Sequence, residues 1–557
     1  MLPSPLTRHP GAPTAVIAGV GFVGSVLIAW ASYVVGTVPG HHLDRSAATG
    51  PYRWPYEIGV VLLLVAWLAL GRLVLDRAVT GAHPGALGRV IVVGAAMAVP
   101  LLFAAPVTSQ DVWANLGQGN VAAHGLDPYS LGPVAVPGAL ADSVAREWLA
   151  TPAPYGPLWV WICRMVVEVT GGHPWAGMFV VRLVCGAGIV VLGVALARLA
   201  RAMGGRPEVA LWLAVAGPFP LLMFLGGLHN DSVMLALLIG GVAVAATQPR
   251  LWRALVLAAA LVGAAGAVKV IALVALPFLP LFWFRYADPA RRDASARAPT
   301  FQRWVSTGMV ASAVGIATLL ALGVVTGLGI GWIHDIGNAR VGVRLFSVPQ
   351  QTGNLLHLLS PGRVADVPAD RYSLTRPIGL VFLVLSVVAV TLTALRRAPE
   401  RTLAMVMLLT VVSSTAPRIW YLSWPLVFVA VIVAVDHRPR PLLVGAAAGA
   451  SSLALWFPPS VRPQLPEWTL LAFFVPLAAL VAVVVGSALR AEEPTPGRVT
   501  SPRVPPDGTS PRPRRPLPLS SARTSPTGRS SGPSGRRARR RPPRHRSPGP
   551  GAPRTPC

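Results

Sequence analysis

Long apolar segments recur along most of the chain, and they limit what it can fold into. Runs of about 17 to 25 residues are long enough to cross roughly 30 Å of hydrocarbon as helices. Connectors rich in Arg, Pro and Gly separate them. Lipid-embedded backbone groups must be satisfied internally, which favours helices. The pattern predicts an all-α polytopic membrane protein with about 14 transmembrane helices. The predicted spans are residues 14–38, 57–75, 88–106, 175–198, 208–226, 232–247, 253–267, 269–284, 305–328, 376–395, 402–416, 420–436, 441–457 and 468–489.

Composition supports this class, because 53% of residues are hydrophobic, only 12% are charged and the mean hydropathy is +0.58. Soluble domains carry about twice that share of charge. Cys163, Cys185 and Cys557 have neither disulfide nor zinc spacing, so we interpret the cysteines as packing residues.

Arginine placement predicts the orientation, since short cytoplasmic loops are enriched in Lys and Arg. The arginines of five connectors are therefore assigned to the cytoplasm: Arg72, Arg77 and Arg89; Arg198, Arg201 and Arg206; those between 285 and 303; Arg396, Arg397 and Arg401; Arg438 and Arg440. Successive spans cross the membrane in opposite directions, which places residues 107–174, 229–231, 269, 331–375 and 418–421 on the extracytoplasmic side and both termini in the cytoplasm. This number of crossings is consistent only if residues 155–169 form an interfacial or re-entrant helix instead of a span.

The C-terminal segment differs from the rest of the chain. Residues 1–493 form the predicted transmembrane domain, and residues 494–557 contain 15 arginines against one acidic residue and almost no bulky apolar side chains. Such a segment cannot bury a core and is predicted to be a disordered cytoplasmic tail. Basic tails next to a span more often contact anionic lipid than nucleic acid, so we predict the membrane and no nucleic acid as partner.

Four predicted outer segments carry polar or aromatic residues of interest, each with a structural alternative. Ser109 can cap a helix whose first turn holds Asp111, where a carboxylate gains from the helix dipole. Asn230 and Asp231, with Ser232, can cap the next span, although polar groups at membrane depth are functional candidates by default. Trp420 and Tyr421, with Trp424, fit an aromatic interfacial belt or a surface for sugar rings. In the loop 331–375, His334, Asp335, Arg340 and Arg344 fit solvated residues as well as ligands.

Lys269 is the single lysine in a chain with 47 arginines, and it interrupts an apolar run. An ammonium is a compact charge that fits one phosphate oxygen in a tight pocket, whereas a guanidinium is larger and suited to bidentate contact. The alternative is a lysine that reaches toward the interface without a chemical role.

Six motifs occur in the order found in a known family: TSQDVWANLGQG, GLDPYSLGP, APYGPLW, GLHNDSVMLALLIGG, AVKVIALVALPF and WYLSWPL. Over roughly residues 10–490 the chain resembles the actinobacterial polyprenol-phosphomannose-dependent α-1,6-mannosyltransferases of the MptB type, in the GT-C superfamily. It departs from them beside IWY, where Arg418 stands and the family more usually shows Pro-Trp-Tyr. The tail has no counterpart that we can identify in the family.

The resemblance implies a plasma-membrane enzyme that extends the α-1,6-mannan of a lipomannan-type lipoglycan from a lipid-linked β-mannosyl phosphate. It assigns the catalytic carboxylate to Asp111, the donor-phosphate lysine to Lys269 and the HND motif to His229, Asn230 and Asp231. Trp420, Tyr421, Tyr155 and Arg344 are the further predicted substrate-binding residues.

An inverting displacement with Asp111 as base needs no nucleotide site and no cofactor, and a divalent metal bridging Asp111 and Asp231 stays open. The alternative function is a secondary transporter or lipid flippase, which predicts polar residues in both membrane halves and two similar halves of the chain. A non-catalytic scaffold would leave the HND cluster and the single lysine unexplained.

Overall fold

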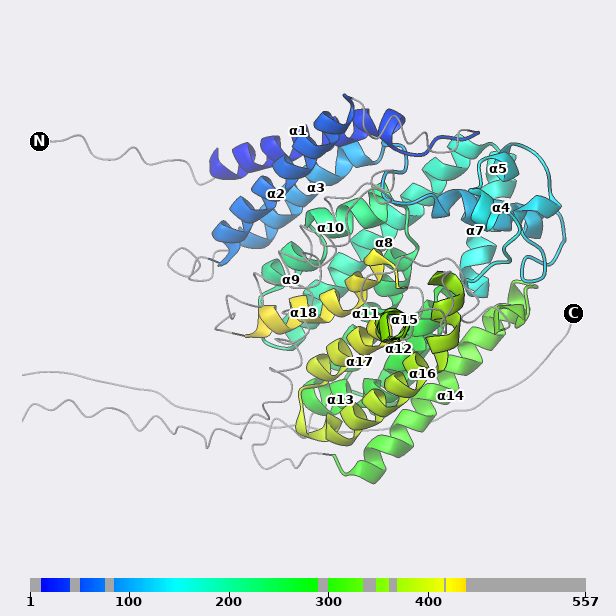
Figure 1. Cartoon of the computed structure of the whole chain (residues 1–557). Helices are drawn as coiled ribbons and strands as arrows, with labels where there is room; N and C mark the ends of the chain where they lie inside the picture. The colour runs from blue at the N-terminus through cyan, green and yellow to red at the C-terminus, as the bar shows by residue number, and fades with distance from the viewer. Residues whose placement is uncertain are drawn as a thin grey trace, which may run out of the picture. The chain divides into compact units, whose positions relative to one another are not determined.

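The computed structural model describes residues 12–40, 51–75, 85–288, 299–333, 347–359, 368–414 and 417–436. These residues form helices and connecting loops without a β-strand, so the predicted all-α class is confirmed (Figure 1). The α-helices are α1 Ala12–Val35, α2 Arg53–Leu75, α3 Ala86–Leu101, α4 Asp111–Ala123, α5 Ala139–Asp142, α6 Arg146–Leu149, α7 Pro157–Thr170, α8 Pro174–Ala202, α9 Pro207–Ala214, α10 Pro218–Leu221, α11 Asp231–Thr247, α12 Leu251–Val268, α13 Leu279–Phe282, α14 Phe301–Val325, α15 Val348–Leu359, α16 Pro368–Thr393, α17 Pro399–Ser413 and α18 Ser423–Val435. Shorter 3₁₀ or π segments are η2 Pro133–Ala135, η3 Leu222–Gly226, η4 Val270–Phe278, η5 Trp283–Ala287, η7 Gly331–Ile333, η8 Ala394–Arg396 and η9 Ile419–Leu422.

Seven helices in the described part are long and apolar enough to cross a membrane, or eight if the pair Pro207–Ala214 and Pro218–Gly226, bent by 52°, forms one broken span. The seven are Pro13–Val35, Arg53–Leu75, Pro174–Ala202, Leu251–Val268, Val270–Ala287, Phe301–Val325 and Leu374–Arg396. Each predicted span within the described residues overlaps a helix. The predicted spans 441–457 and 468–489 and the tail 494–557 lie outside the described residues.

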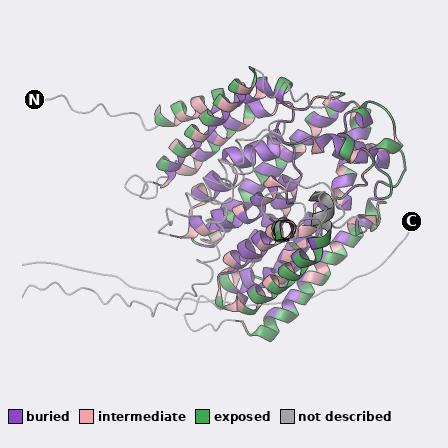
Figure 2. Cartoon of the chain, viewed as in Figure 1, coloured by how far each residue is buried: buried purple, intermediate pink, exposed green. Residues whose placement is uncertain are grey.

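Exposed apolar side chains cover the outer helices, as expected for a surface that faces lipid. Figure 2 shows exposed residues along α1 and α14. On α16 the exposed fractions of Leu380, Leu385 and Leu392 are 62%, 65% and 70%. Buried residues concentrate on α8, α11, α12 and α18, where α11 packs against α8 and α12 and α18 packs against α9 and α17. α11 carries Asp231 and α18 carries Trp424, and Lys269 directly follows α12.

The predicted non-spanning helix at residues 155–169 is α7, which has 14 residues. That length is below the roughly 20 residues needed to span the hydrocarbon. Its Pro157 starts the helix and Gly171, with φ of 59°, ends it. The helix packs on α4, and the two belong to the segment between α3 and α8 that is predicted to lie outside the cytoplasm (Figure 1).

Candidate active site

The site is built where the segment that follows α3 meets the segment between η3 and α11. The backbone N–H of Val107 donates to the carbonyl of Gly226 at 2.9 Å. The hydroxyl of Thr108 donates to the carbonyl of Leu222 at 3.3 Å. A side-chain carbon on Gly227 would collide with the hydroxyl oxygen of Thr108. Glycine therefore leaves room for the Thr108 side chain, and the contacts between the two segments fix Asp111 relative to His229.

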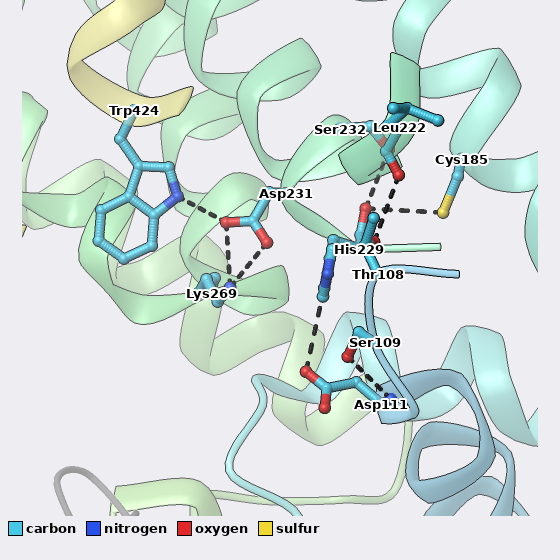
Figure 3. Close-up of polar contacts among 10 residues, drawn as sticks. All are labelled: Thr108, Ser109, Asp111, Cys185, Leu222, His229, Asp231, Ser232, Lys269 and Trp424. Atoms are coloured by element: carbon cyan, nitrogen blue, oxygen red, sulfur yellow. Dashed lines mark hydrogen bonds and ion pairs between the residues drawn. The ribbon is translucent and has the colours of Figure 1, made fainter. Parts of the chain in front are cut away.

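Unusual backbone geometry precedes His229. Residues Leu222–Gly226 form a π-helical turn, a feature that is rare and frequent at functional sites. Leu228 has a φ of 54°, the only positive φ of a non-glycine residue in the described part, and its side chain is fully buried. Such a conformation persists only where the surrounding structure determines it. The turn aims the His229 side chain at the start of α4 (Figure 3).

His229 connects the two segments through its ring. It stacks on Trp420, with ring centroids 3.7 Å apart and an angle of 20° between the planes. Its Nδ1 lies 3.9 Å from Asp111 Oδ2 (Figure 3). The exposed fraction of the side chain is 3% for His229 and 18% for Asp111. Asp111 is thus the more accessible of the two partners.

Asp111 is the first residue of α4, which confirms its predicted place in the first turn. The prediction that Ser109 is the N-cap is wrong: Gln110 is the N-cap and its side chain makes no capping bond. Ser109 Oγ accepts the backbone N–H of Asp111 at 3.1 Å instead. The hydroxyl thus closes a local turn by binding the backbone N–H two residues on, at the start of the helix.

Burial raises the pKa of Asp111 above the ordinary aspartate value. Three contacts oppose that shift, in decreasing order the positive charge of Arg418, the Ser109 hydroxyl and the positive charge of Lys269. A base must be ionised to accept a proton, so its activity is lost as the pH falls through its pKa. The acid limit set by Asp111 therefore lies at higher pH than for a solvated aspartate.

Lys269 is ion-paired with Asp231. Its ammonium donates to Oδ1 at 3.0 Å and to Oδ2 at 2.9 Å of that carboxylate, which is fully buried (Figure 3). The exposed fraction of the Lys269 side chain is 11%, so the lysine does not reach into solvent. Trp424 Nε1 also donates to Asp231 Oδ1. α12 ends at Val268 and η4 begins at Val270, which confirms the predicted break at Lys269.

Aromatic rings surround the Lys269 ammonium. The distances from Nζ to the ring centroids are 4.6 Å for Tyr421, 5.4 Å for Trp424 and 5.9 Å for Tyr155. Tyr421 and Trp424 stack on each other with centroids 4.3 Å apart. Rings at these distances attract a cation through their quadrupoles. The enclosure leaves the ammonium partly desolvated, and charges interact more strongly with an anion where water is excluded.

Tyr155 reaches this enclosure because Gly156 packs on the end of α12. The backbone N–H of Gly156 donates to the Val268 carbonyl at 3.2 Å. A side-chain carbon on Gly156 would collide with the Ala267 carbonyl oxygen. The sequence stretch before α7 is therefore held directly beside Lys269.

Asn230 lies in the sequence between His229, which approaches Asp111, and Asp231, which pairs with Lys269. It is the N-cap residue of α11, but its side chain makes no capping bond, and Asp231 is turned to Lys269. The alternative in which the Asn230 and Asp231 side chains cap α11 is therefore wrong. Asn230 Nδ2 is buried and has no hydrogen-bond partner among the described residues. A buried donor without a partner is costly and is a natural contact for a ligand oxygen.

The structure brings together all of the predicted site residues that it describes: Asp111, Tyr155, His229, Asn230, Asp231, Lys269, Trp420 and Tyr421. Arg344, with the rest of residues 334–346, lies outside the described residues. No group of three or more His, Cys, Asp or Glu side chains that could hold a metal occurs in the described part of the chain.

Three further residues of the site were not among the predicted site residues. Trp424, interpreted from the sequence as part of an aromatic belt or a surface for sugar rings, binds Asp231. Arg418 carries charge close to Asp111. Arg182 of α8, fully buried, donates from Nε to the Leu225 carbonyl and from Nη1 to the Leu102 carbonyl, both at 3.1 Å, and so joins α3 to the turn before His229. An arginine inside an apolar span was the available signal.

Comparison with known proteins finds one family. The model of the "Alpha-(1->6)-mannopyranosyltransferase, N-terminal domain" family matches residues 18–285. Alpha-(1->6)-mannopyranosyltransferase A of Mycobacterium tuberculosis is 31% identical over 467 residues, which cover 81% of this chain and 86% of that protein. The A protein of Corynebacterium glutamicum is 31% identical over 58% of this chain and 66% of its own length, and the B protein of that organism is 29% identical over 58% and 56%. No solved structure matches.

The Lys269–Asp231 pair predicts a strong coupling of stability. Lys269→Met alone leaves the buried Asp231 carboxylate without its counterion and should lower the free energy of unfolding by about 3–5 kcal/mol. Adding Asp231→Asn removes that charge while the amide oxygen still accepts from Trp424, so the double variant should recover most of the loss. Thermal unfolding of both single variants and the double variant in detergent measures the coupling. Losses that simply add would contradict a buried ion pair.

Proposed function

The chain belongs to the alpha-(1->6)-mannopyranosyltransferase family, and from this premise we propose that it transfers mannose from a polyprenyl-phosphomannose to a lipid-linked α-1,6-mannan outside the cytoplasm. It is a glycosyltransferase and a multi-pass membrane protein. One observation carries the finer proposal: the Asp111 carboxylate and the Lys269–Asp231 pair lie in one site, and the site residues predicted from the sequence all fall on the predicted extracytoplasmic side.

The proposed donor half is the enclosure around Lys269. Asp231 takes the ammonium through two oxygens, and an ammonium has three N–H donors, so one donor is left for a phosphate oxygen. Asn230, the residue before Asp231, has a buried Nδ2 without a partner among the described residues and is the proposed second donor. As the phosphate leaves, its negative charge grows, and fixed donors in a dry site stabilise such a charge strongly.

The proposed base is Asp111. The acceptor hydroxyl oxygen attacks C1 of the donor mannose, the bond from C1 to the phosphate oxygen breaks, and polyprenyl phosphate leaves with the bonding electrons. The hydroxyl proton passes to Asp111. A single displacement turns a β-mannosyl donor into an α-linked product. The proposed step needs no cofactor, because residues of the chain account for both the proton and the leaving group.

The aromatic residues are the proposed contacts of the sugar rings. Trp420 stacks on His229, and the rings of Tyr421 and Tyr155 lie 4.6 Å and 5.9 Å from the Lys269 ammonium. Aromatic faces pack well on the apolar C–H faces of pyranoses while leaving hydroxyls free for polar partners. Arg344 is retained as a proposed substrate contact.

The function is tested with membranes that contain the protein. They are incubated with radiolabelled polyprenyl-phosphomannose and a short α-1,6-mannoside, and the product linkage is determined. The proposal predicts an extended mannoside with a new α-1,6 bond. GDP-mannose as the sole donor should give no product when the lipid donor cannot be regenerated. Transfer directly from the nucleotide sugar, or a product with another linkage, would contradict the proposal.

The role of Lys269 predicts that charge alone is insufficient. Lys269→Arg keeps the positive charge but places a larger, planar group against Asp231 and the rings. We expect transfer to fall roughly 10- to 1000-fold, the scale of one lost charge-stabilising donor. Assays use equal amounts of folded protein, with Arg253→Lys on α12 as a control substitution away from the site. Wild-type transfer rates in Lys269→Arg would contradict the proposed role of the ammonium as a donor to the leaving phosphate.

A further inference from the structure

A second cation stands at the other end of the site. Arg418 directly precedes η9, and its side chain is half-buried. Its guanidinium carbon lies 5.5 Å from the Trp148 ring centroid and 5.8 Å from that of Trp420. Trp148 belongs to α6 in the outer loop, whereas Trp420 belongs to the site. Flanking rings attract a guanidinium and restrict its position.

Trp420 and His229 connect the Arg418 guanidinium to Asp111 through successive side-chain contacts. Trp420 stacks on His229 at 3.7 Å, and His229 Nδ1 lies 3.9 Å from the Asp111 carboxylate. The charge of Arg418 also acts on Asp111 directly, and it favours the ionised carboxylate more than the charge of Lys269 does. The Lys269 ammonium is in addition paired with Asp231, whose negative charge acts on Asp111 in the opposite sense, so the pair as a whole favours the ionised carboxylate less than Lys269 alone would.

We infer that Arg418 is a positioning residue for the transfer reaction, a guanidinium held against two tryptophan rings that keeps the Asp111 carboxylate ionised and ready to accept the acceptor's proton. This inference rests on the proposed function. The charges of the site are then divided between two tasks. Lys269 is bound to Asp231 and contacts the donor phosphate, while Arg418 stabilises the ionised form of the base, Asp111.

A guanidinium suits this task because it stays protonated at every pH at which a protein is folded. Asp111 is mostly buried, and burial favours its neutral, inactive form. Arg418 opposes that cost. The other titratable or charged groups that act on Asp111 or adjoin it come from four segments and stay the same when only Arg418 is changed: Tyr155, His229, Asp231, Lys269 and Tyr421.

The test is the dependence of mannosyl transfer on pH in three variants of the full chain, with polyprenyl-phosphomannose and a short α-1,6-mannoside as substrates. Arg418→Gln removes the charge, and Arg418→Lys retains it. Arg146→Gln removes an exposed arginine from α6, the helix that carries Trp148, and serves as the matched control.

Arg418→Gln should shift the acid limb of kcat to higher pH by roughly one unit, the lower end of the effect of an opposite charge nearby. The sign follows because losing a positive charge makes ionised Asp111 less favourable. The rate at a pH on the wild-type acid limb should then fall up to about tenfold, and the deficit should disappear at high pH. Arg418→Lys and Arg146→Gln should show the acid limb of kcat at the same pH as the wild-type protein.

Three outcomes would overturn the inference. A loss in Arg418→Gln that is equal at all pH values would indicate a purely structural role. A raised KM for the donor with an unshifted limb would make Arg418 a phosphate contact. An equal shift in Arg146→Gln would reduce the effect to net surface charge. Each of these leaves the proposed function standing, whereas failure of the wild-type protein to form mannoside product would remove the proposed function itself.

Discussion

A buried ion pair, Lys269 with Asp231, is the constraint on which the centre of this structure depends. Removing two ions from water is expensive, and the expense is offset only by close geometry and additional hydrogen bonds. Here both carboxylate oxygens contact the ammonium, and Trp424 donates to one of them. The three residues come from α11, from the break between α12 and η4, and from α18. The ends of these helices must therefore stay together.

The proposed base is tied to this centre by backbone contacts instead of charge. Val107 and Thr108 donate hydrogen bonds to carbonyls of the turn that precedes α11, and Gly227 leaves room for the Thr108 side chain. Both halves of the site thus belong to one preorganised unit, in which the carboxylate and the cationic donor need no large rearrangement before reaction. Such fixed dipoles and charges are the main source of catalysis in many enzymes.

Much of this arrangement could be predicted from the sequence, because apolar length predicts spans and a lone lysine inside an apolar run predicts a break. The partner of Lys269 could not, because Asp231 is 38 residues away and helix packing decides which side chains meet. The same holds for Trp424. Ser109 was predicted as an N-cap because sequence patterns do not separate a cap from the turn that precedes it by one residue. Arg418 was visible only as a departure from a family motif.

The central claim is that Asp111 acts as the base while the Lys269 side binds the donor. The most direct measurement compares donor affinity with turnover in Asp111→Asn, which keeps the shape of the side chain and removes the proton acceptor. The account predicts wild-type affinity for polyprenyl-phosphomannose and wild-type thermal stability, with turnover lower by about 10²- to 10⁴-fold. Turnover close to that of the wild type, in protein that binds the donor normally, would contradict it.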